Sequence, residues 1–139
     1  MKFHIIILVL FLISCQEKRS PVENSVSDPV SRVFFKNINA GDTLESPFTI
    51  QMGVINMKIK PAGLLEAGTG HHHLIIDKGF MDYGEIIPMD NGYIHYGKGD
   101  TVAQVELNSG MHTLTLQFAN GMHVSYGEQF SHTLNVYIK

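Results

Sequence analysis

Apolar and polar residues alternate along most of the chain after residue 31, which is the pattern of half-buried β-strands. Residues 47–56 show it clearly, because Phe48, Ile50, Met52 and Val54 stand at every second position and so share one face of a strand. No segment has the periodicity of a helix of three turns. The same alternation predicts strands over residues 32–38, 47–56, 71–77, 93–96, 101–107, 111–119 and 130–138.

The clearest local signal is Asn108-Ser109-Gly110, a three-residue connection that ends in glycine between two alternating segments. Such a connection is typical of a β-hairpin with a bulge. We therefore expect residues 101–107 to pair with residues 111–119. Alternation also places His112 on the apolar face of the second of these strands, and His132 on the inner face of the last strand.

Short strands that recur at intervals of about 8 to 15 residues are typical of β-sandwiches. Residues 61–70 and 78–92 are rich in glycine, proline and polar side chains, so we expect loops there. The sequence thus predicts an all-β protein. We expect residues 31–139 to form an antiparallel, immunoglobulin-like β-sandwich of about seven strands.

The beginning of the chain has the features of a secretory signal. Lys2 precedes an unbroken apolar run over residues 5–13, which is too short for a transmembrane helix of about 20 residues. The following Leu12-Ile13-Ser14-Cys15 resembles the lipobox of bacterial lipoproteins. That resemblance implies removal of residues 1–14 and lipidation of Cys15, with residues 15–30 forming the lipidated end and a flexible tether.

Gln16 follows the cysteine where some Gram-negative bacteria place aspartate to retain a lipoprotein in the inner membrane. Its presence favours an exported lipoprotein anchored in the outer membrane and facing the periplasm. The expected partner is then the membrane itself, through the lipid on Cys15, because several acyl chains give a stable anchor.

Composition narrows the class of function. The chain has 139 residues, 10 Lys plus Arg, 13 Asp plus Glu and a formal charge of −3, enough for one domain. Its basic residues are scattered, which argues against nucleic acid as a partner, since phosphate binding requires a positive patch. A single cysteine excludes an intrachain disulfide and a cysteine-based zinc finger. The 8 histidines are the unusual feature.

Three of these histidines are consecutive, in Gly70-His71-His72-His73-Leu74-Ile75-Ile76-Asp77. In a strand, His72 shares a face with Leu74 and points to the core, whereas His71 and His73 share the opposite face with Asp77. Residues two apart in a strand are about 6.7 Å apart at Cα. Their rings can lean onto one ion, because a Zn–N bond is about 2.0–2.1 Å long.

The remaining ligands of such a site are expected from other strands or loops. His95 in Tyr93-Ile94-His95-Tyr96 and His123 in Gly121-Met122-His123 are the candidates. The neighbouring Met122, like Met111 beside His112, adds a thioether, and thioether with imidazole suits copper. The sequence therefore predicts copper or zinc, bound by His71, His73, His95 and His123.

Histidines also have purely structural roles. His112 and His132 stand on apolar faces near strand starts, where we expect hydrogen-bonded side chains at the rim of the sandwich. We expect the ring of His72 to bond a loop carbonyl. The histidine pattern is less specific than a CxxC pair or an HExxH motif.

Several segments together resemble the DUF4399 family, small exported bacterial domains of unknown function. They are Gly70-His71-His72-His73-Leu74-Ile75-Ile76-Asp77, Ile87-Pro88-Met89-Asp90, Ile94-His95-Tyr96-Gly97-Lys98-Gly99 and residues 107–116, with residues 46–54 and 61–63 upstream. The resemblance implies an exported β-rich domain and supplies no activity. Residues 119–127 depart from the family pattern, which has an acidic residue before the histidine of this loop and a proline-rich turn after it.

Three functions are compatible with these features. The first is a non-enzymatic metal-binding lipoprotein of the cell envelope, which we favour. The second is a metal-free binding or scaffold module for an envelope protein or glycan partner. The third is a zinc enzyme in which three histidines hold an activated water, with Asp77, Asp82 and Glu85 as nearby acids.

Overall fold

The computed structural model describes residues 32–139, and the signal segment, Cys15 and the tether predicted from the sequence lie outside the described residues. The described part consists of strands and one short 3-10 helix. They are β1 (Arg32–Phe35), β2 (Thr43–Leu44), β3 (Phe48–Ile55), β4 (Lys58–Ile59), β5 (Thr69–Ile76), β6 (Tyr93–His95), β7 (Val102–Val105), β8 (Gly110–Ala119), η1 (Glu128–Phe130) and β9 (Ser131–Ile138).

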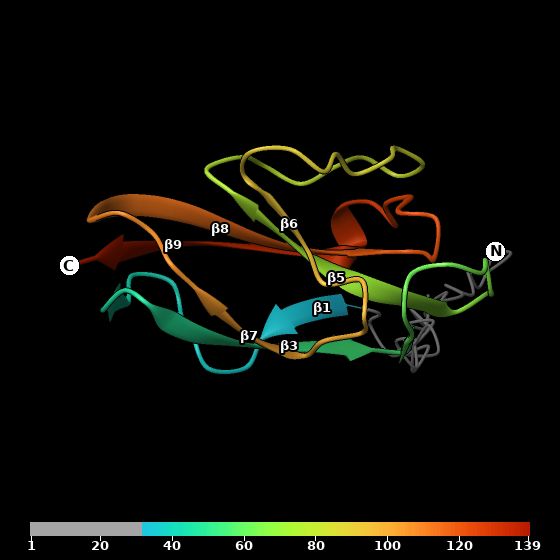
Figure 1. Cartoon of the computed structure of the whole chain (residues 1–139), viewed down its shortest axis with the longest axis horizontal. Helices are drawn as coiled ribbons and strands as arrows, with labels where there is room; N and C mark the ends of the chain where they lie inside the picture. The colour runs from blue at the N-terminus through green and yellow to red at the C-terminus, as the bar shows by residue number, and fades with distance from the viewer. Residues whose placement is uncertain (1–31) are drawn as a thin grey trace, which may run out of the picture.

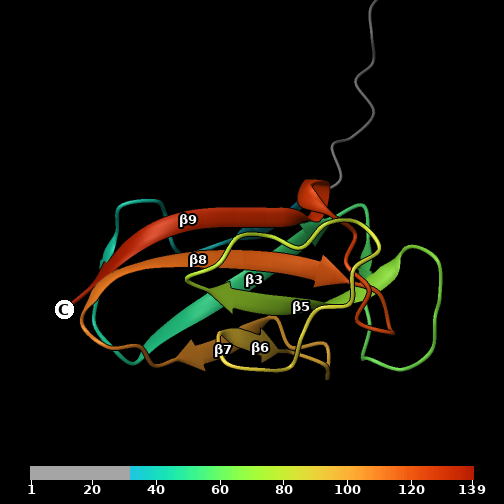
Figure 2. The ribbon, with the colours of Figure 1, turned by 90° about the horizontal axis from the view of Figure 1, so that it is seen from above.

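The strands form two sheets that pack face to face (Figure 1). The smaller sheet has the order β1-β3-β7, and the larger one the order β2-β9-β8-β5-β4, with β6 also paired to β5. Figure 2 shows β9, β8 and β5 side by side, with β3 crossing behind them. The prediction of an all-β sandwich is confirmed. Its immunoglobulin-like topology remains a prediction.

The core lies between the two sheets and follows the predicted alternation. In β3, Phe48, Ile50 and Met52 are buried while Thr49 and Gln51 are exposed. They pack with the apolar residues of the larger sheet, which include Leu74, Leu114, Leu116, Phe118, Leu134, Val136 and Ile138. Each buried side chain of this size contributes about 1.5–3 kcal/mol to folding, so this core fixes the register of β5.

The outer face of the larger sheet is also covered. Thr115 and Gln117 of β8 point away from the core, yet both are fully buried. The Thr115 hydroxyl donates to the carbonyl of Lys78, and the Gln117 side-chain oxygen accepts from the N–H of Met81 at 3.1 Å. The loop of residues 77–92 therefore forms a third layer over β5 and β8, visible along the top of Figure 1.

The prediction of a hairpin at Asn108-Ser109-Gly110 is wrong. β7 pairs with β3 in the smaller sheet, through Val105 opposite Phe48, whereas β8 pairs with β5 and β9 in the larger sheet. The connection crosses from one sheet to the other, and the N–H of Leu107 donates to the Ser46 hydroxyl on the way. The local turn signal is real, but burial of Val105 against the core decides the pairing partner of β7.

The prediction of about seven strands omitted two short ones. β2 and β4 have two residues each, too few for an alternating pattern, and they pair in parallel with β9 and β5. All other pairings between strands are antiparallel within residues 32–139. Within the same residues we find no helix long and apolar enough to span a bilayer.

Candidate metal centre

Strand β5 carries two histidines to the outer face of the larger sheet. Its register places His71 opposite Ala119 and His73 opposite Gln117 of β8. On the other edge, β6 pairs so that His95 stands directly opposite His73. Residues directly opposite each other share a face of the sheet. The pairing of β5 with β6 therefore brings His95 beside the two histidines of β5.

Gly97 leaves room for the ring of His95. A Cβ at position 97 would come within 2.1 Å of Cε1 and 2.3 Å of Nε2 of His95. Such distances are far shorter than any real contact between these atoms. The ring therefore occupies the space that a side chain at position 97 would fill, and the absence of that side chain permits its orientation.

His123 reaches the same place from the loop that follows β8. The side-chain oxygen of Asn120 accepts from the N–H groups of Met122 at 2.9 Å and Val124 at 3.1 Å, which closes a tight turn. His123 itself has a φ of 64°, a left-handed conformation that few non-glycine residues adopt. Its carbonyl accepts from the N–H of Ile87 at 2.9 Å, so the covering loop holds the turn in place.

The four histidines form one cluster. The Nε2 atom of His71 lies 3.0 Å from Nε2 of His73 and 3.1 Å from Nε2 of His95. The ring centroid of His123 lies 4.5 Å from that of His95 and 5.1 Å from that of His71. One ring nitrogen from each of the four lies within 4.8 Å of the other three. The structure thus brings together all four predicted ligands.

Burial keeps three rings of this cluster, those of His71, His73 and His95, uncharged. Burial, followed by the neighbouring imidazoles, lowers the pKa of His71 to about 4 and that of His73 to about 2. Burial also lowers the pKa of His95, and His123 adds to that effect. These three rings are therefore neutral at pH 7, and neutral imidazole is the form that binds metal ions.

Hydrogen bonding alone does not satisfy the cluster. A neutral imidazole has one N–H and one bare nitrogen. Nε2 of His71 can therefore donate a hydrogen bond to only one of the two ring nitrogens that face it. Among the described residues, Nδ1 of His71, His73 and His123 has no partner. Buried polar atoms normally have partners. A metal ion would bind the facing Nε2 atoms of His71, His73 and His95 at once, and Nδ1 of each ring would then carry the N–H.

The spacing of the nitrogens suits such an ion. Two nitrogens bound to a tetrahedral Zn²⁺ at about 2.0–2.1 Å lie about 3.3 Å apart. The observed 3.0 and 3.1 Å between Nε2 atoms are close to that value. The four ligand nitrogens as a group lie within 4.8 Å of one another, so binding an ion would draw the rings closer together.

The prediction for His72 was half right. Its side chain points into the core, fully buried, with its ring 5.1 Å from that of Phe118. The expected bond to a loop carbonyl is absent: neither ring nitrogen has a partner within residues 32–139. The covering loop of residues 77–92 lies on the other face of the sheet, so its carbonyls are out of reach of His72.

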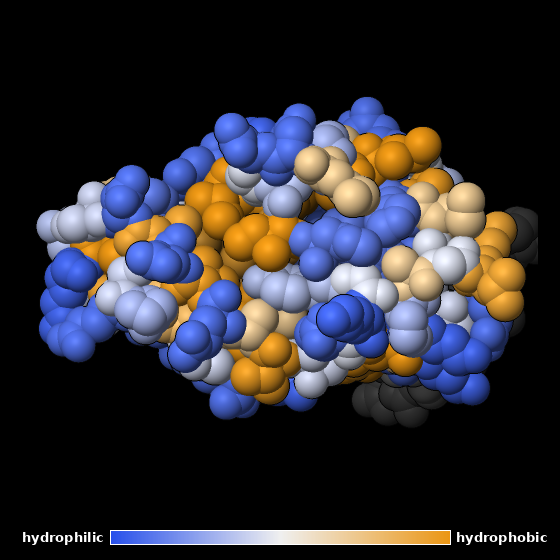
Figure 3. Space-filling view, viewed as in Figure 1, coloured by the Kyte–Doolittle hydropathy of each residue, from blue (hydrophilic) through white to orange (hydrophobic). Residues whose placement is uncertain are grey.

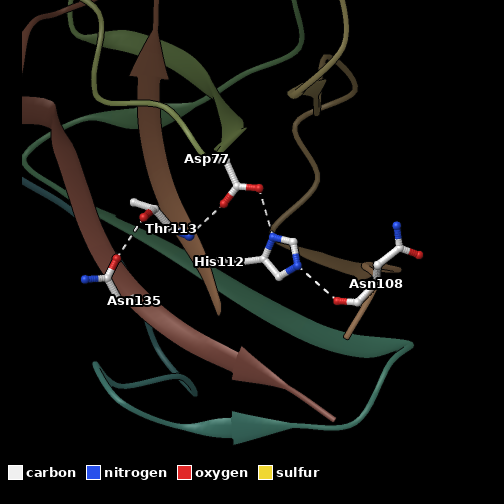
Figure 4. A network of polar contacts seen from close by, with 5 residues as sticks. All are labelled: Asp77, Asn108, His112, Thr113 and Asn135. Carbon is white, nitrogen blue, oxygen red and sulfur yellow. Dashed lines mark hydrogen bonds and ion pairs between the residues drawn. The ribbon is translucent and has the colours of Figure 1, made fainter. Parts of the chain in front are cut away.

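His112 and His132 are hydrogen-bonded, as predicted. Nδ1 of His112 lies 2.9 Å from the carboxylate of Asp77, and its Nε2 lies 3.0 Å from the carbonyl of Asn108. Figure 4 shows the His112 ring between these two partners. The other carboxylate oxygen of Asp77 accepts from the N–H of Thr113. Nδ1 of His132 accepts from the N–H of Phe35 at 3.3 Å. Both histidines lie outside the cluster.

The acids proposed for a zinc enzyme do not join the cluster. Asp77 binds His112 and Thr113, and the carboxylate of Glu85 accepts from the backbone N–H of Asp82 at 3.2 Å. No carboxylate within residues 32–139 belongs to the group of histidines that can share one ion. These acids are near His73 in the sequence, but the fold places them outside the cluster.

Comparison with known proteins gives a family and no activity. A family model described as a domain of unknown function, DUF4399, matches residues 50–139, which is more than half of the chain and includes all four histidines. No curated protein and no solved structure matches the chain. The match confirms the resemblance that residues 70–77 and 94–99 carry in the sequence.

Proposed function

We propose that this chain, which belongs to the DUF4399 family, is a lipid-anchored envelope protein with a non-enzymatic metal site for copper or zinc. One observation carries the proposal: Nε2 of His71 lies 3.0 Å from Nε2 of His73 and 3.1 Å from Nε2 of His95, and His123 completes a group of four nitrogens. Strand register positions three of these side chains, and a tight turn positions the fourth. The fold therefore brings the cluster together without an ion.

The surroundings of the cluster favour reversible binding over catalysis. Histidines that hold a metal almost always donate their second ring N–H to an acceptor, and losing that acceptor costs about 10–100-fold in affinity. Nδ1 of His71, His73 and His123 has no acceptor in the described part of the chain. A carboxylate that could act as a general base is also missing from the group. These features suit a carrier that exchanges its ion.

The proposed location rests on the first residues of the chain. The apolar run over residues 5–13 and the sequence Leu12-Ile13-Ser14-Cys15 support export and lipidation of Cys15. Gln16 supports the outer membrane, with the domain facing the periplasm. The membrane is the expected partner, and an envelope protein that delivers or receives the ion would be a second.

The test is a calorimetric titration of the purified protein, without a His tag, with zinc and with copper. We expect one ion per chain, with a dissociation constant below about 10 µM, which corresponds to roughly −7 kcal/mol. In the His71→Ala/His73→Ala variant two of the four nitrogens are lost, so binding should weaken by at least about 100-fold. His132→Ala is the matched control, since it removes a histidine of the same sheet outside the cluster, and it should bind normally.

Two results would contradict the proposal. One is the absence of binding tighter than about 10 µM for either metal. The other is equal loss of binding in the control and in the double variant. In either case the cluster would be an architectural feature, and a metal-free module for an envelope protein or glycan partner would become the better account.

A further inference from the structure

We infer that the cluster of His71, His73, His95 and His123 is built for a monovalent copper ion in preference to divalent zinc. The inference rests on the proposed metal-binding function and makes it more specific. Its basis is the combination of four uncharged donors, a half-closed site without an acid, and a surrounding surface that is apolar and carries thioethers.

The first argument is charge. All four donors are imidazole nitrogens, so the bound ion keeps its full charge in the site. The solvation free energy that an ion loses on burial grows with the square of its charge. His71 and His73 are fully buried. A divalent ion held by these ligands would therefore lose about four times as much solvation as a monovalent one.

No acid offsets that loss within residues 32–139. The group of side chains there that can share one ion consists of the four histidines, with no carboxylate among them. The polar side chain opposite His73 is Gln117, a neutral amide whose NH₂ donates to the carbonyls of Gly127 and Phe130. Glu85, on the covering loop, bonds to its own turn.

The second argument is the surface around the cluster. His95 and His123 are half-buried, so the cluster is accessible from their side. The loops that meet at His123 expose large apolar side chains: Met122 is 57% exposed, Ile86 68%, Met89 72% and Leu64 92%. In Figure 3, orange hydrophobic residues lie among blue hydrophilic ones at the surface where the covering loop of residues 77–92 runs.

Contacts between these loops bring the backbone that carries the two methionines close to His123. Met122 directly precedes His123, and Ile86 pairs with Val124 on its other side. Ile87, two residues before Met89, donates its N–H to the carbonyl of His123. The N–H of Gly63, beside Leu64, donates to the carbonyl of Gly121. Thioethers select monovalent copper, whereas zinc is commonly held by carboxylates and thiolates as well as imidazole.

The experiment is a pair of competition titrations under anaerobic conditions with reductant, using bicinchoninate for monovalent copper and a chromophoric chelator for zinc. Protein prepared without the lipid carries Cys15→Ser, so that a free thiol does not compete. We expect copper to bind at least about 100-fold more tightly than zinc and to displace it at one equivalent. Equal or tighter binding of zinc would overturn this inference and leave the metal-binding function standing. Binding of neither ion would overturn both.

A charge variant tests the physical reason. His123→Asp replaces a neutral donor by an anionic one, so we expect the preference for copper over zinc to fall by at least about tenfold. His123→Ala is the control that removes the donor without adding charge. An unchanged preference in His123→Asp would contradict the charge argument.

A thioether variant tests the surface. Met89→Leu/Met122→Leu keeps the apolar volume and removes both sulfurs, and we expect it to slow copper uptake from the bicinchoninate complex several-fold without slowing zinc uptake. Met111→Leu is the matched control, because Met111 is 67% exposed at the opposite end of β8. Equal rates in the double variant and the control would show that these thioethers play no part.

Discussion

At the scale of single residues, the histidines of this protein differ by what surrounds them. His71 and His73 are buried beside other imidazoles, which lowers their pKa values. His112 lies beside the carboxylate of Asp77, and the hydrogen bond between them raises its pKa. The same side chain is thus kept neutral in one place and favoured as a cation in the other. His71 and His73 belong to the cluster, and His112 does not.

The pair of His112 and Asp77 should make stability depend on pH. Because the folded pKa of His112 is raised, its contribution is fully present below the unfolded value of about 6.5 and is lost as pH rises through the folded pKa. Asp77→Asn removes the charge but keeps an acceptor for the N–H of Thr113. We expect this substitution to lower the free energy of unfolding by at most about 1 kcal/mol at pH 5.5, since the pair is partly exposed. At pH 9 we expect no change.

The measurement is chemical unfolding of the unmodified protein and of Asp77→Asn from pH 5.5 to pH 9, with an NMR titration of the His112 ring. Asparagine tolerates the left-handed φ of 58° at position 77, so no backbone strain is introduced. If both proteins had the same pH dependence, the pair would contribute nothing through its charge.

At the scale of elements, the cluster depends on how β6 lies along β5. This pairing is only three residues long, and it determines that His95 stands opposite His73. The ring of His95 then occupies the space over Gly97. A short strand and one missing side chain therefore decide whether the third ligand reaches the other two.

Gly97→Ala should damage the site without unfolding the protein. The added methyl group would occupy the position of the His95 ring, so the ring must turn away, and we expect metal affinity to fall at least about tenfold. Thermal stability should change little, because the displaced atoms are the end of a side chain. Gly79→Ala is the matched control, since a Cβ there has open space. Unchanged affinity in Gly97→Ala, measured by calorimetry, would contradict the arrangement described for His95.

Alternation in the sequence predicted the strands and the faces of their side chains, because it reflects burial directly. It correctly separated His71 and His73 from His72. It could not reveal that β7 pairs with β3, since the Asn108-Ser109-Gly110 signal is local whereas the pairing follows from packing in the core. It also could not place His123, which reaches the cluster through hydrogen bonds of Asn120 and Ile87 in loops that have no periodicity.

At the scale of the whole molecule, the fold is a sandwich with one sheet face converted into a binding site by covering loops. The small sheet and the core support β5 from one side, and residues 77–92 and 119–124 enclose its histidines from the other. We propose that this domain is attached to the membrane through Cys15. Such an attachment would keep an exchangeable ion within the envelope.

The anchor has its own test. We expect the mature protein to consist of residues 15–139 with acyl chains on Cys15, as seen by intact mass spectrometry and by recovery in the outer-membrane fraction. Cys15→Ser should keep residues 1–14 and carry no acyl chain, because both processing steps require the cysteine. Ser25→Ala, a change within the tether, is the control and should be processed normally. An exported native chain with an unmodified Cys15 would contradict lipidation.

The most direct test of the central claim is anomalous diffraction from crystals of the metal-loaded protein, recorded on both sides of the absorption edge of the metal. The account predicts a single strong peak about 2.0–2.1 Å from the Nε2 atoms of His71, His73 and His95, with His123 as the fourth ligand. A peak beside His112 and Asp77, or no peak among the four histidines of fully loaded protein, would contradict it.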